Sequence, residues 1–488
     1  MMASHHPHAA EAAPQGAEKA PPEGIPPALP GRWRLLALLG TAQFMLVLDV
    51  TVVTIALPDI GASLGLGRSA LTWVLSAYTL AFGGLMLLGG KAADLWGARP
   101  LVLGGLAVFT AASLTAGLAG GPAGAALLVG ARAAQGIGAA LLSPAALATV
   151  TTAFHGQERR RALGVWAALG GTGSAVGVLA GGLLTAGPGW RWVFFVNVPV
   201  GLALLAALPS VLPASARRRG ARLDVPGALL VTAATAAAIQ GLVRAGDDGW
   251  RSAQALLPLA LAGLLYGAFA AVQRRSRAPL MHLAVLTRRP VLTGVALMLV
   301  GTALLITQFF LGSFYLQRAA GHGPLATGLL FLPVAVGTIV GAHTASHAVS
   351  RFGARAVAPV ALAVTAAALA VPAAALGTWT LVGGMSVASA AVGAVLVCAT
   401  LTALARVPHQ EAGLVSGIVS TCHEFGAALG VAVVSGVAAG SIASGGATTS
   451  GFARALWAAT VVAAVGAAVA AYLIPAGRPP AGTHVALH

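Results

Sequence analysis

The stretch from Gly90 to Arg99 reads GKAADLWGAR, and its last part returns 256 positions later. Residues 96–99, WGAR, are matched by residues 352–355, FGAR, and each copy follows a long apolar run. Residues 177–178, Gly-Val, likewise return as residues 430–431. An even number of apolar runs separates the copies, so both have the same orientation across a bilayer. The repeat predicts two parallel halves related by an axis along the membrane normal.

The composition indicates a membrane protein. Of the 488 residues, 58% are hydrophobic and only 8% are charged, whereas about 25% are charged in a typical soluble protein. Mean hydropathy is +0.87. The apolar runs are rich in Ala, Leu, Val and Gly and lack the two-residue alternation of a transmembrane barrel. The predicted fold class is therefore an all-α polytopic membrane protein.

The apolar runs predict 14 transmembrane helices, because one bilayer span takes about 20 residues. Together with the repeat, they predict two six-helix bundles with two inserted helices between them. The predicted helices cover residues 34–57, 70–90, 100–118, 123–150, 162–185, 191–212, 226–243, 253–272, 291–316, 325–349, 356–376, 379–404, 411–437 and 454–474.

Five regions follow from this assignment. They are a disordered cytoplasmic tail (1–31), an N-terminal six-helix bundle (32–212), a linker with two inserted transmembrane helices (213–290), a C-terminal six-helix bundle (291–475) and a second cytoplasmic tail (476–488).

The net charge of +16 is explained by the loops. With the N-terminus in the cytoplasm, 21 of the 28 Lys and Arg residues lie in cytoplasmic loops and tails, six lie in outer loops, and Arg132 lies within a helix. The cytoplasmic loops of membrane proteins carry an excess of Lys and Arg over the outer loops. The bias therefore predicts that both termini are cytoplasmic, and no nucleic-acid partner is expected.

The sequence carries no sign of an enzyme. Residues 84–91, GLMLLGGK, resemble a phosphate-binding loop, but the spacing is one residue off and Ala92 replaces the Ser or Thr. His343 and His347 share one helical face, where we favour a polar patch over a metal site. We expect no metal, no cofactor and no catalytic residue, so any transport would be driven by an ion gradient or by the solute itself.

Residues 90–99 resemble the Gly-x-x-x-Asp-x-x-Gly-x-Arg signature of the major facilitator superfamily. The matching residues are Gly90, Asp94, Gly97 and Arg99, while Leu95 stands where the family often has a basic residue. The resemblance implies the major facilitator fold, alternating access and a gating role for these four residues.

Three further stretches are similar to the 14-helix drug:proton antiporters of the EmrB/QacA type. Residues 48–58, LDVTVVTIALP, match the signature of the first helix, and residues 190–201, WRWVFFVNVPVG, match the start of the sixth. Residues 132–140, RAAQGIGAA, match the buried-arginine motif of the fourth helix. The resemblance assigns Arg132 to proton coupling and Gln135, Gly136 and Gly138 to conformational gating.

Gly173, Gly177 and Gly181 are each four residues apart and form a stripe of small residues along one helix. Such a stripe permits close approach of a neighbouring helix. Together with Gly182 it resembles the family's antiporter motif, although Val178 stands where that motif often has proline. Plain helix packing remains open as the alternative to gating.

Asp49 and Glu424 are the acids that lie well within the predicted helices. Ionisable groups inside a membrane are costly and usually serve transport. We therefore assign Asp49, Glu424 and Arg132 to proton coupling, with Asp49 as the first candidate. A pairing that only holds helices together is the alternative for both acids.

These features predict a secondary active exporter in the cell (cytoplasmic) membrane. It exchanges lipophilic or cationic small molecules for protons by alternating access, and a monomer suffices. The first alternative is a transporter of the same fold for an amino acid, sugar or siderophore. A membrane sensor without transport is the second, and a membrane enzyme is the third.

Overall fold

The computed structural model describes residues 31–154, 156–213, 224–276, 285–405, 407, 409–443 and 449–474. Helices dominate this part of the chain, and it contains no β-strand. The predicted all-α class is confirmed. The tails predicted at 1–31 and 476–488 lie outside the described residues, except for Gly31.

The N-terminal half is a group of long helices whose sixth segment is broken. Pro199 has no backbone N–H, so the helical hydrogen bond to the carbonyl of residue 195 cannot form. The elements are α1 (Arg32–Leu64), α2 (Arg68–Trp96), α3 (Ala98–Gly117), α4 (Gly124–Ala153), α5 (Gly156–Ala186), α6 (Trp192–Phe195), α7 (Asn197–Ala207) and the short η1 (Leu208–Ser210).

Two inserted helices, α8 (Val225–Asp248) and α9 (Ala253–Arg275), form a hairpin between the halves. Asp224 accepts a hydrogen bond from the backbone N–H of Gly227 at 3.0 Å, and its second oxygen accepts one from Gln273 at 2.6 Å. The hydroxyls of Thr235 and Tyr266 lie 3.0 Å apart. Side-chain hydrogen bonds therefore join α8 and α9 at two places along the hairpin.

The C-terminal half repeats the arrangement of long helices, and its first helix ends in a π-helical turn, η3. The elements are α10 (Arg289–Phe314), η3 (Tyr315–Ala319), α11 (Pro324–Phe352), α12 (Ala354–Ala374), α13 (Thr378–Leu404), α14 (His409–Val437), α15 (Ala439–Ala443) and α16 (Ser450–Leu473).

Each predicted span falls on helical structure. By length and composition, 11 helices of the described chain can cross a membrane, and three apolar stretches, 70–86, 176–186 and 226–242, are shorter. The membrane character is confirmed, whereas the count of 14 and the cytoplasmic termini stay predictions. The helix of the first predicted span continues past residue 57, through Pro58 to Leu64.

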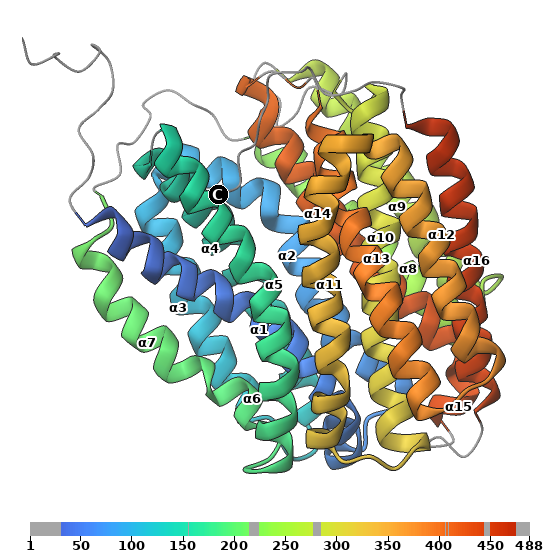
Figure 1. Cartoon of the computed structure of the whole chain (residues 1–488). Helices are drawn as coiled ribbons and strands as arrows, with labels where there is room; N and C mark the ends of the chain where they lie inside the picture. Colours follow the sequence, from blue (N-terminus) through green and yellow to red (C-terminus); the bar gives the residue numbers. More distant parts are fainter. Residues whose placement is uncertain are drawn as a thin grey trace, which may run out of the picture.

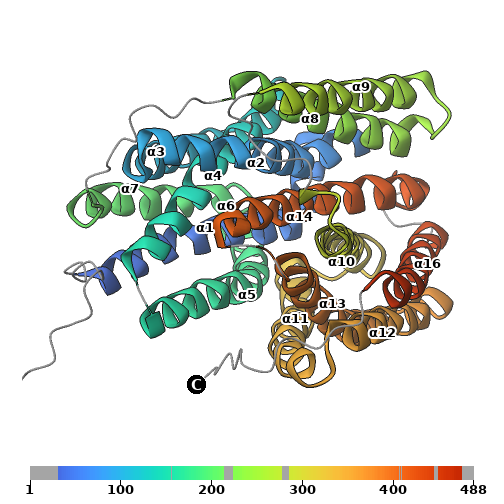
Figure 2. The same ribbon diagram turned by 90° about the horizontal axis from the view of Figure 1, so that it is seen from above.

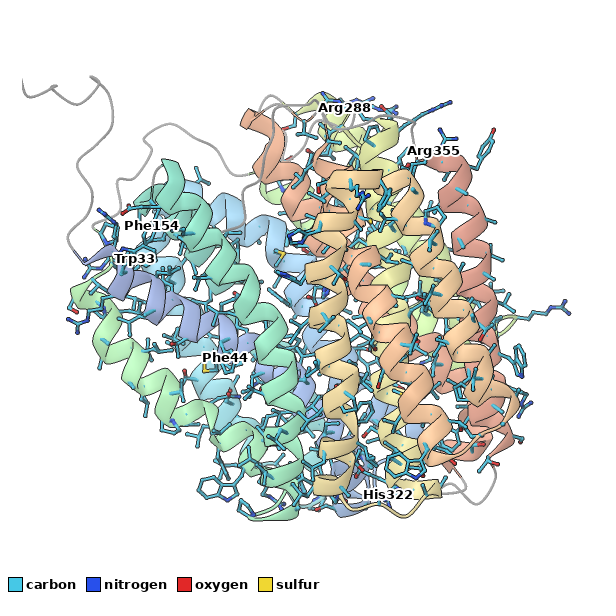
Figure 3. The ribbon with its side chains drawn as sticks, in the orientation of Figure 1. Trp33, Phe44, Phe154, Arg288, His322 and Arg355 are labelled. Carbon is cyan, nitrogen blue, oxygen red and sulfur yellow. The ribbon has the colours of Figure 1, made fainter. Side chains whose placement is uncertain are left out.

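The two halves lie side by side, and α8 packs along the edge where α2 meets α14 (Figures 1 and 2). Ile239 of α8 shares one apolar cluster with Trp73 of α2 and Ala428 of α14. The inserted hairpin therefore contacts both halves. Arg288 and Arg355 lie at one end of the molecule and His322 at the other (Figure 3).

The internal repeat is visible in the backbone of two equivalent turns. Gly97, between α2 and α3, has φ 90° and ψ 153°, and Gly353, between α11 and α12, has φ 81° and ψ 156°. This region of φ and ψ is almost restricted to glycine. The repeat seen at residues 96–99 and 352–355 thus has the same glycine turn in both copies, although Gly249 between α8 and α9, outside the repeat, has this turn as well (φ 92°, ψ 149°).

Candidate functional site

Asp49 lies near the middle of α1 and is completely buried. Its Oδ2 accepts a hydrogen bond from Nη1 of Arg132, and the two residues form an ion pair. Its Oδ1 accepts hydrogen bonds from Gln135 Nε2 at 3.1 Å and from Asn197 Nδ2 at 2.9 Å. Helices α1, α4 and α7 thus meet at a single carboxylate.

The guanidinium of Arg132 has partners on two helices and on a ring. Its Nε donates to the carbonyl of Val74 at 3.0 Å, and its Nη1 donates to Gln135 Oε1 at 2.9 Å. Its Cζ lies 4.4 Å from the centre of the Tyr78 ring, a favourable cation–π distance. The guanidinium of Arg132, which the sequence places within a helix, therefore points into the helix bundle and not toward lipid.

This pair behaves as a unit. Breaking a buried ion pair by removal of one partner typically costs about 3–5 kcal/mol, because the other charge is left without a partner. Gln135 extends the network, since its Nε2 also donates to Ser113 Oγ at 2.8 Å. A change of charge at Asp49 would consequently be felt on α2, α3, α4 and α7.

A small cavity of about 20 Å³ lies between the two halves, beside Arg132. This volume holds about one water molecule. Its polar lining comes from Thr54, Ser76, Thr79 and Arg132, and the other six lining residues are apolar. The Ser76 hydroxyl is buried without a hydrogen-bond partner among the described residues. Asp49 does not line this cavity, whereas its partner Arg132 does.

Glu424 belongs to the C-terminal half and lies near the same boundary between the two halves. It lies on α14 one helical turn before the cavity-lining Ala427 and Ala428, and its side chain packs against Gly83 of α2. The carboxylate is 13% exposed and lies 3.2 Å from the ring of His423. Asp49 and Glu424 make no direct contact with each other, so the structure brings only Asp49 and Arg132 together.

The motif glycines of α4 provide close helix contacts. A Cβ at Gly136 would collide with the backbone of Tyr78 on α2. A Cβ at Gly138 would lie 2.6 Å from the carbonyl of Gly105 on α3. These two glycines hold α4, and with it Arg132, against two neighbouring helices.

The residues of the loop signature surround the turn after α2. A Cβ at Gly90 would make an ordinary van der Waals contact with Pro144 of α4, at 3.9 Å, and Gly97 forms the turn itself. Arg99 donates to the carbonyl of Pro209 at 3.0 Å. Asp94 belongs to α2, but its side chain lies outside the described part of the structure.

The glycine stripe of α5 divides between two partners. Gly173 faces Val47, Gly177 faces Thr51 and Gly181 faces Ile55, and all three partners lie on α1. Gly182 instead faces α11 of the other half, where its nearest neighbours include Gly328. Three of the motif glycines therefore pack helices within one half, while the fourth joins the two halves.

The proline within α1 explains another contact between the halves. Pro58 cannot donate to the carbonyl of Thr54, and this carbonyl accepts a hydrogen bond from Ser313 of α10 at 3.1 Å. Gln317 donates to the carbonyl of Ile55 at 2.9 Å, and Arg318 donates to the carbonyl of Pro58. The C-terminal half therefore supplies a donor to the one carbonyl of α1 that Pro58 leaves without its helical partner, and it contacts two further carbonyls nearby.

The two histidines on α11 form no larger cluster. The rings of His343 and His347 have centroids 5.3 Å apart, and both side chains are exposed. The described residues contain no group of three or more His, Cys, Asp or Glu that could hold a metal ion. These histidines are separate from the site around Arg132.

Three members of the site were not identified from the sequence. Asn197 was noted only as part of the stretch 190–201, and Tyr78 and Ser113 were not singled out. Their contacts with Asp49, Arg132 and Gln135 depend on packing between distant helices. One available signal was that Asn197 is the single asparagine of the chain.

The family model of the Major Facilitator Superfamily matches residues 39–431. The chain belongs to the major facilitator superfamily. The puromycin resistance protein of Streptomyces alboniger is 38% identical over 428 residues, which cover 85% of this chain and 83% of that protein. The cephamycin export protein of Amycolatopsis lactamdurans is 37% identical, with 82% and 83% covered. The multidrug resistance protein Stp of Mycobacterium tuberculosis is 32% identical, with 84% and 76% covered.

A solved structure shares the fold. The bacterial homologue of the human lysosomal transporter Spinster has a TM-score of 0.64 and 15% identity, with 91% of this chain and 98% of that chain covered. Membership of the major facilitator superfamily, predicted from residues 90–99, is confirmed. This chain is a multi-pass transporter of the cell membrane with small-molecule substrates.

Proposed function

We propose that this transporter exports lipophilic or cationic small molecules, antibiotics among them, in exchange for protons. The observation that carries the proposal is the buried pair of Asp49 and Arg132 beside a cavity to which both halves contribute. The names of the relatives support a role in antibiotic export.

Protonation of Asp49 is the proposed coupling step. A proton on the carboxylate removes its negative charge and with it the attraction to Arg132, which stays charged at any working pH. The guanidinium then loses its main partner and can move relative to the cavity that it lines. Release of the proton restores the pair, so the two protonation states favour different arrangements of α1 and α4.

Glu424 is the proposed partner for a cationic solute. Asp49 is completely buried against Arg132, whereas Glu424 lies one turn from the cavity lining and remains partly exposed beside the ring of His423. Uptake of a cation beside Glu424 and uptake of a proton would then oppose each other electrostatically. Six of the ten residues lining the cavity are apolar, and such a wall favours lipophilic solutes over sugars or amino acids when the halves separate to admit a solute.

The proposal includes no cofactor, no metal and no chemical change in the solute, so the protein is not an enzyme. The proton gradient supplies the energy, and no nucleic acid takes part. One chain contributes both halves of the cavity, which supports function as a monomer. The proposal also retains 14 transmembrane helices and cytoplasmic termini.

The test is a susceptibility panel in a bacterial host that lacks its own efflux pumps. Cells expressing the chain should tolerate higher concentrations of puromycin and of lipophilic cations such as ethidium than cells with empty vector. Everted vesicles from these cells should lose part of their pH gradient when ethidium is added. Asp49→Asn should abolish both effects at equal expression.

Lack of protection against every compound of a chemically diverse panel would contradict drug export. Protection with no change in the pH gradient would contradict proton exchange but leave drug export standing. Full proton-coupled export by Asp49→Asn would move the coupling site elsewhere, and Glu424→Gln would then be the next variant to test.

A further inference from the structure

Asn197 is the first residue of α7 and the single asparagine of the chain. Its side chain is 1% exposed and donates to Asp49 Oδ1 at 2.9 Å. We propose that Asn197 is a positioning residue that sets the pH at which Asp49 takes up its proton. This inference rests on the proposed function, in which Asp49 carries the coupling proton.

The hydrogen bonds around Asp49 fit its ionised form. Oδ1 accepts from Asn197 and Gln135, and Oδ2 accepts from Arg132. A carboxylate is an acceptor only, whereas a protonated carboxyl group must also donate. Because N–H groups approach both oxygens, these three contacts stabilise the ionised carboxylate more than the protonated carboxyl group.

Gln135 and Asn197 differ in how firmly they are held. The oxygen of Gln135 accepts from Arg132 at 2.9 Å, while its nitrogen donates to both Ser113 and Asp49. The side-chain hydrogen bond of Asn197 within the described chain is the one to Asp49. Asn197 is therefore the amide that depends on the state of Asp49 alone, and it lies beside the break between α6 and α7.

The charged and titratable groups facing Asp49 are few. Arg132 approaches from α4, and Tyr78 from α2 lies with its ring against that guanidinium. In the described residues, α5, α6, α7, α10 and α11 place no charged side chain in hydrogen-bonding or ion-pairing contact with Asp49. Loss of the Asn197 amide would thus change the stabilisation of the carboxylate without removing a charge.

The size of the effect expected on Asp49 protonation follows from the strength of the hydrogen bond between Asn197 and Asp49. A hydrogen bond to a charged group is roughly twice as strong as one between neutral groups. Removal of this donor should therefore weaken the ionised form more than the protonated form. We expect Asn197→Ala to move the midpoint of Asp49 protonation upward by about one pH unit.

The experiment is a pH titration of the purified full-length protein by infrared difference spectroscopy, which needs no solute. The carbonyl band of the protonated carboxyl group is assigned to Asp49 by its loss in Asp49→Asn. Asn197→Ala should show the band at higher pH than the parent. Gln308→Ala is the matched control, because Gln308 is an equally buried amide bonded to Ser389 in the other half.

A second variant covers the case in which Asn197→Ala does not fold. Asn197→Asp has nearly the same shape and places a second carboxyl group beside Asp49, so a protonated band should persist to still higher pH. An unchanged midpoint in both variants, or an equal shift in Gln308→Ala, would overturn the inference. Absence of any Asp49 titration in the parent would overturn the proposed function first, and the inference with it.

Discussion

Gly182→Ala should favour separation of the two halves at one end of the molecule. A Cβ at Gly182 of α5 would lie 2.8 Å from the carbonyl oxygen of Pro324, 3.1 Å from Cα of Leu325 and 3.3 Å from Cα of Gly328. Ordinary contacts of a Cβ begin at 3.4 Å. All three neighbours are backbone atoms of α11, so the helices must move apart by several tenths of an ångström.

The expected magnitude is about 1–3 kcal/mol, the usual cost of an extra methyl group in a tightly packed place. This cost falls on a contact between the halves, because the other stripe glycines of α5 face α1. An energy of this size changes the ratio of two conformations by about 5- to 150-fold. The arrangement with α5 and α11 in contact should become correspondingly rarer.

The assay is a distance measurement between spin labels at Leu183 on α5 and Leu329 on α11, which are both 51% exposed. Cys398 and Cys422 are first replaced by alanine so that only these positions are labelled. Gly182→Ala should shift the distance distribution toward longer values in liposomes. The control is Gly104→Ala in α3, where an added Cβ meets open space. An unchanged distribution in Gly182→Ala, or the same shift in the control, would refute the reasoning.

Three further variants test other contacts. Arg132→Lys keeps the charge but loses the forked contacts to its partners, so export of the panel compounds should fall at least about tenfold at equal expression; full activity would contradict a geometric role. Gly177→Leu should push α1 and α5 apart and lower the thermal midpoint in detergent by several degrees, whereas Gly104→Leu should change it little; equal effects would argue against close packing. Ser313→Ala leaves the carbonyl of Thr54 without its partner, at a cost of about 1 kcal/mol. The label distances should therefore shift in the same direction as in Gly182→Ala, and export should slow because the halves come into contact less often. Unchanged distances would contradict a role of this contact in joining the halves.

Much of the fold could be predicted because it depends on local composition. Long apolar runs must form helices in a bilayer, where every backbone polar group needs an internal partner. The sequence predicts the first helix only to residue 57, where Pro58 and Asp59 interrupt the apolar run, whereas α1 continues to Leu64. The contacts that Ser313 and Gln317 make with the carbonyls of Thr54 and Ile55 beside this proline come from residues more than 250 positions later, so local composition could not predict them.

In the candidate site, too, some residues could be recognised from the local sequence, whereas others depend on packing between distant helices. Asp49 and Arg132 could be identified because charges within apolar runs are rare and costly. Their neighbours could not, since serine, tyrosine and asparagine occur in helices for many reasons. The donation from Asn197 to Asp49 spans 148 residues, and its existence depends on how α7 packs against α1. The match of residues 190–201 to the family's sixth helix and the rarity of asparagine in this chain pointed to that position, but neither indicated its partner.

The two halves share one fold but differ in the chemistry of their cores. In the C-terminal half, α10 and α13 occupy the places that α1 and α4 hold in the repeat, and their buried contact is between neutral Gln308 and Ser389 at 3.1 Å. In the N-terminal half the corresponding helices carry an ion pair. A neutral contact needs no counter-ion and does not respond to a proton, whereas the pair of Asp49 and Arg132 changes its energy whenever Asp49 is protonated. If the coupling proton binds at Asp49, one half provides the element that changes and the other provides a surface whose internal packing stays constant. Movement between them then falls on the seam contacts at Gly182 and Ser313, which join the halves without belonging to either core.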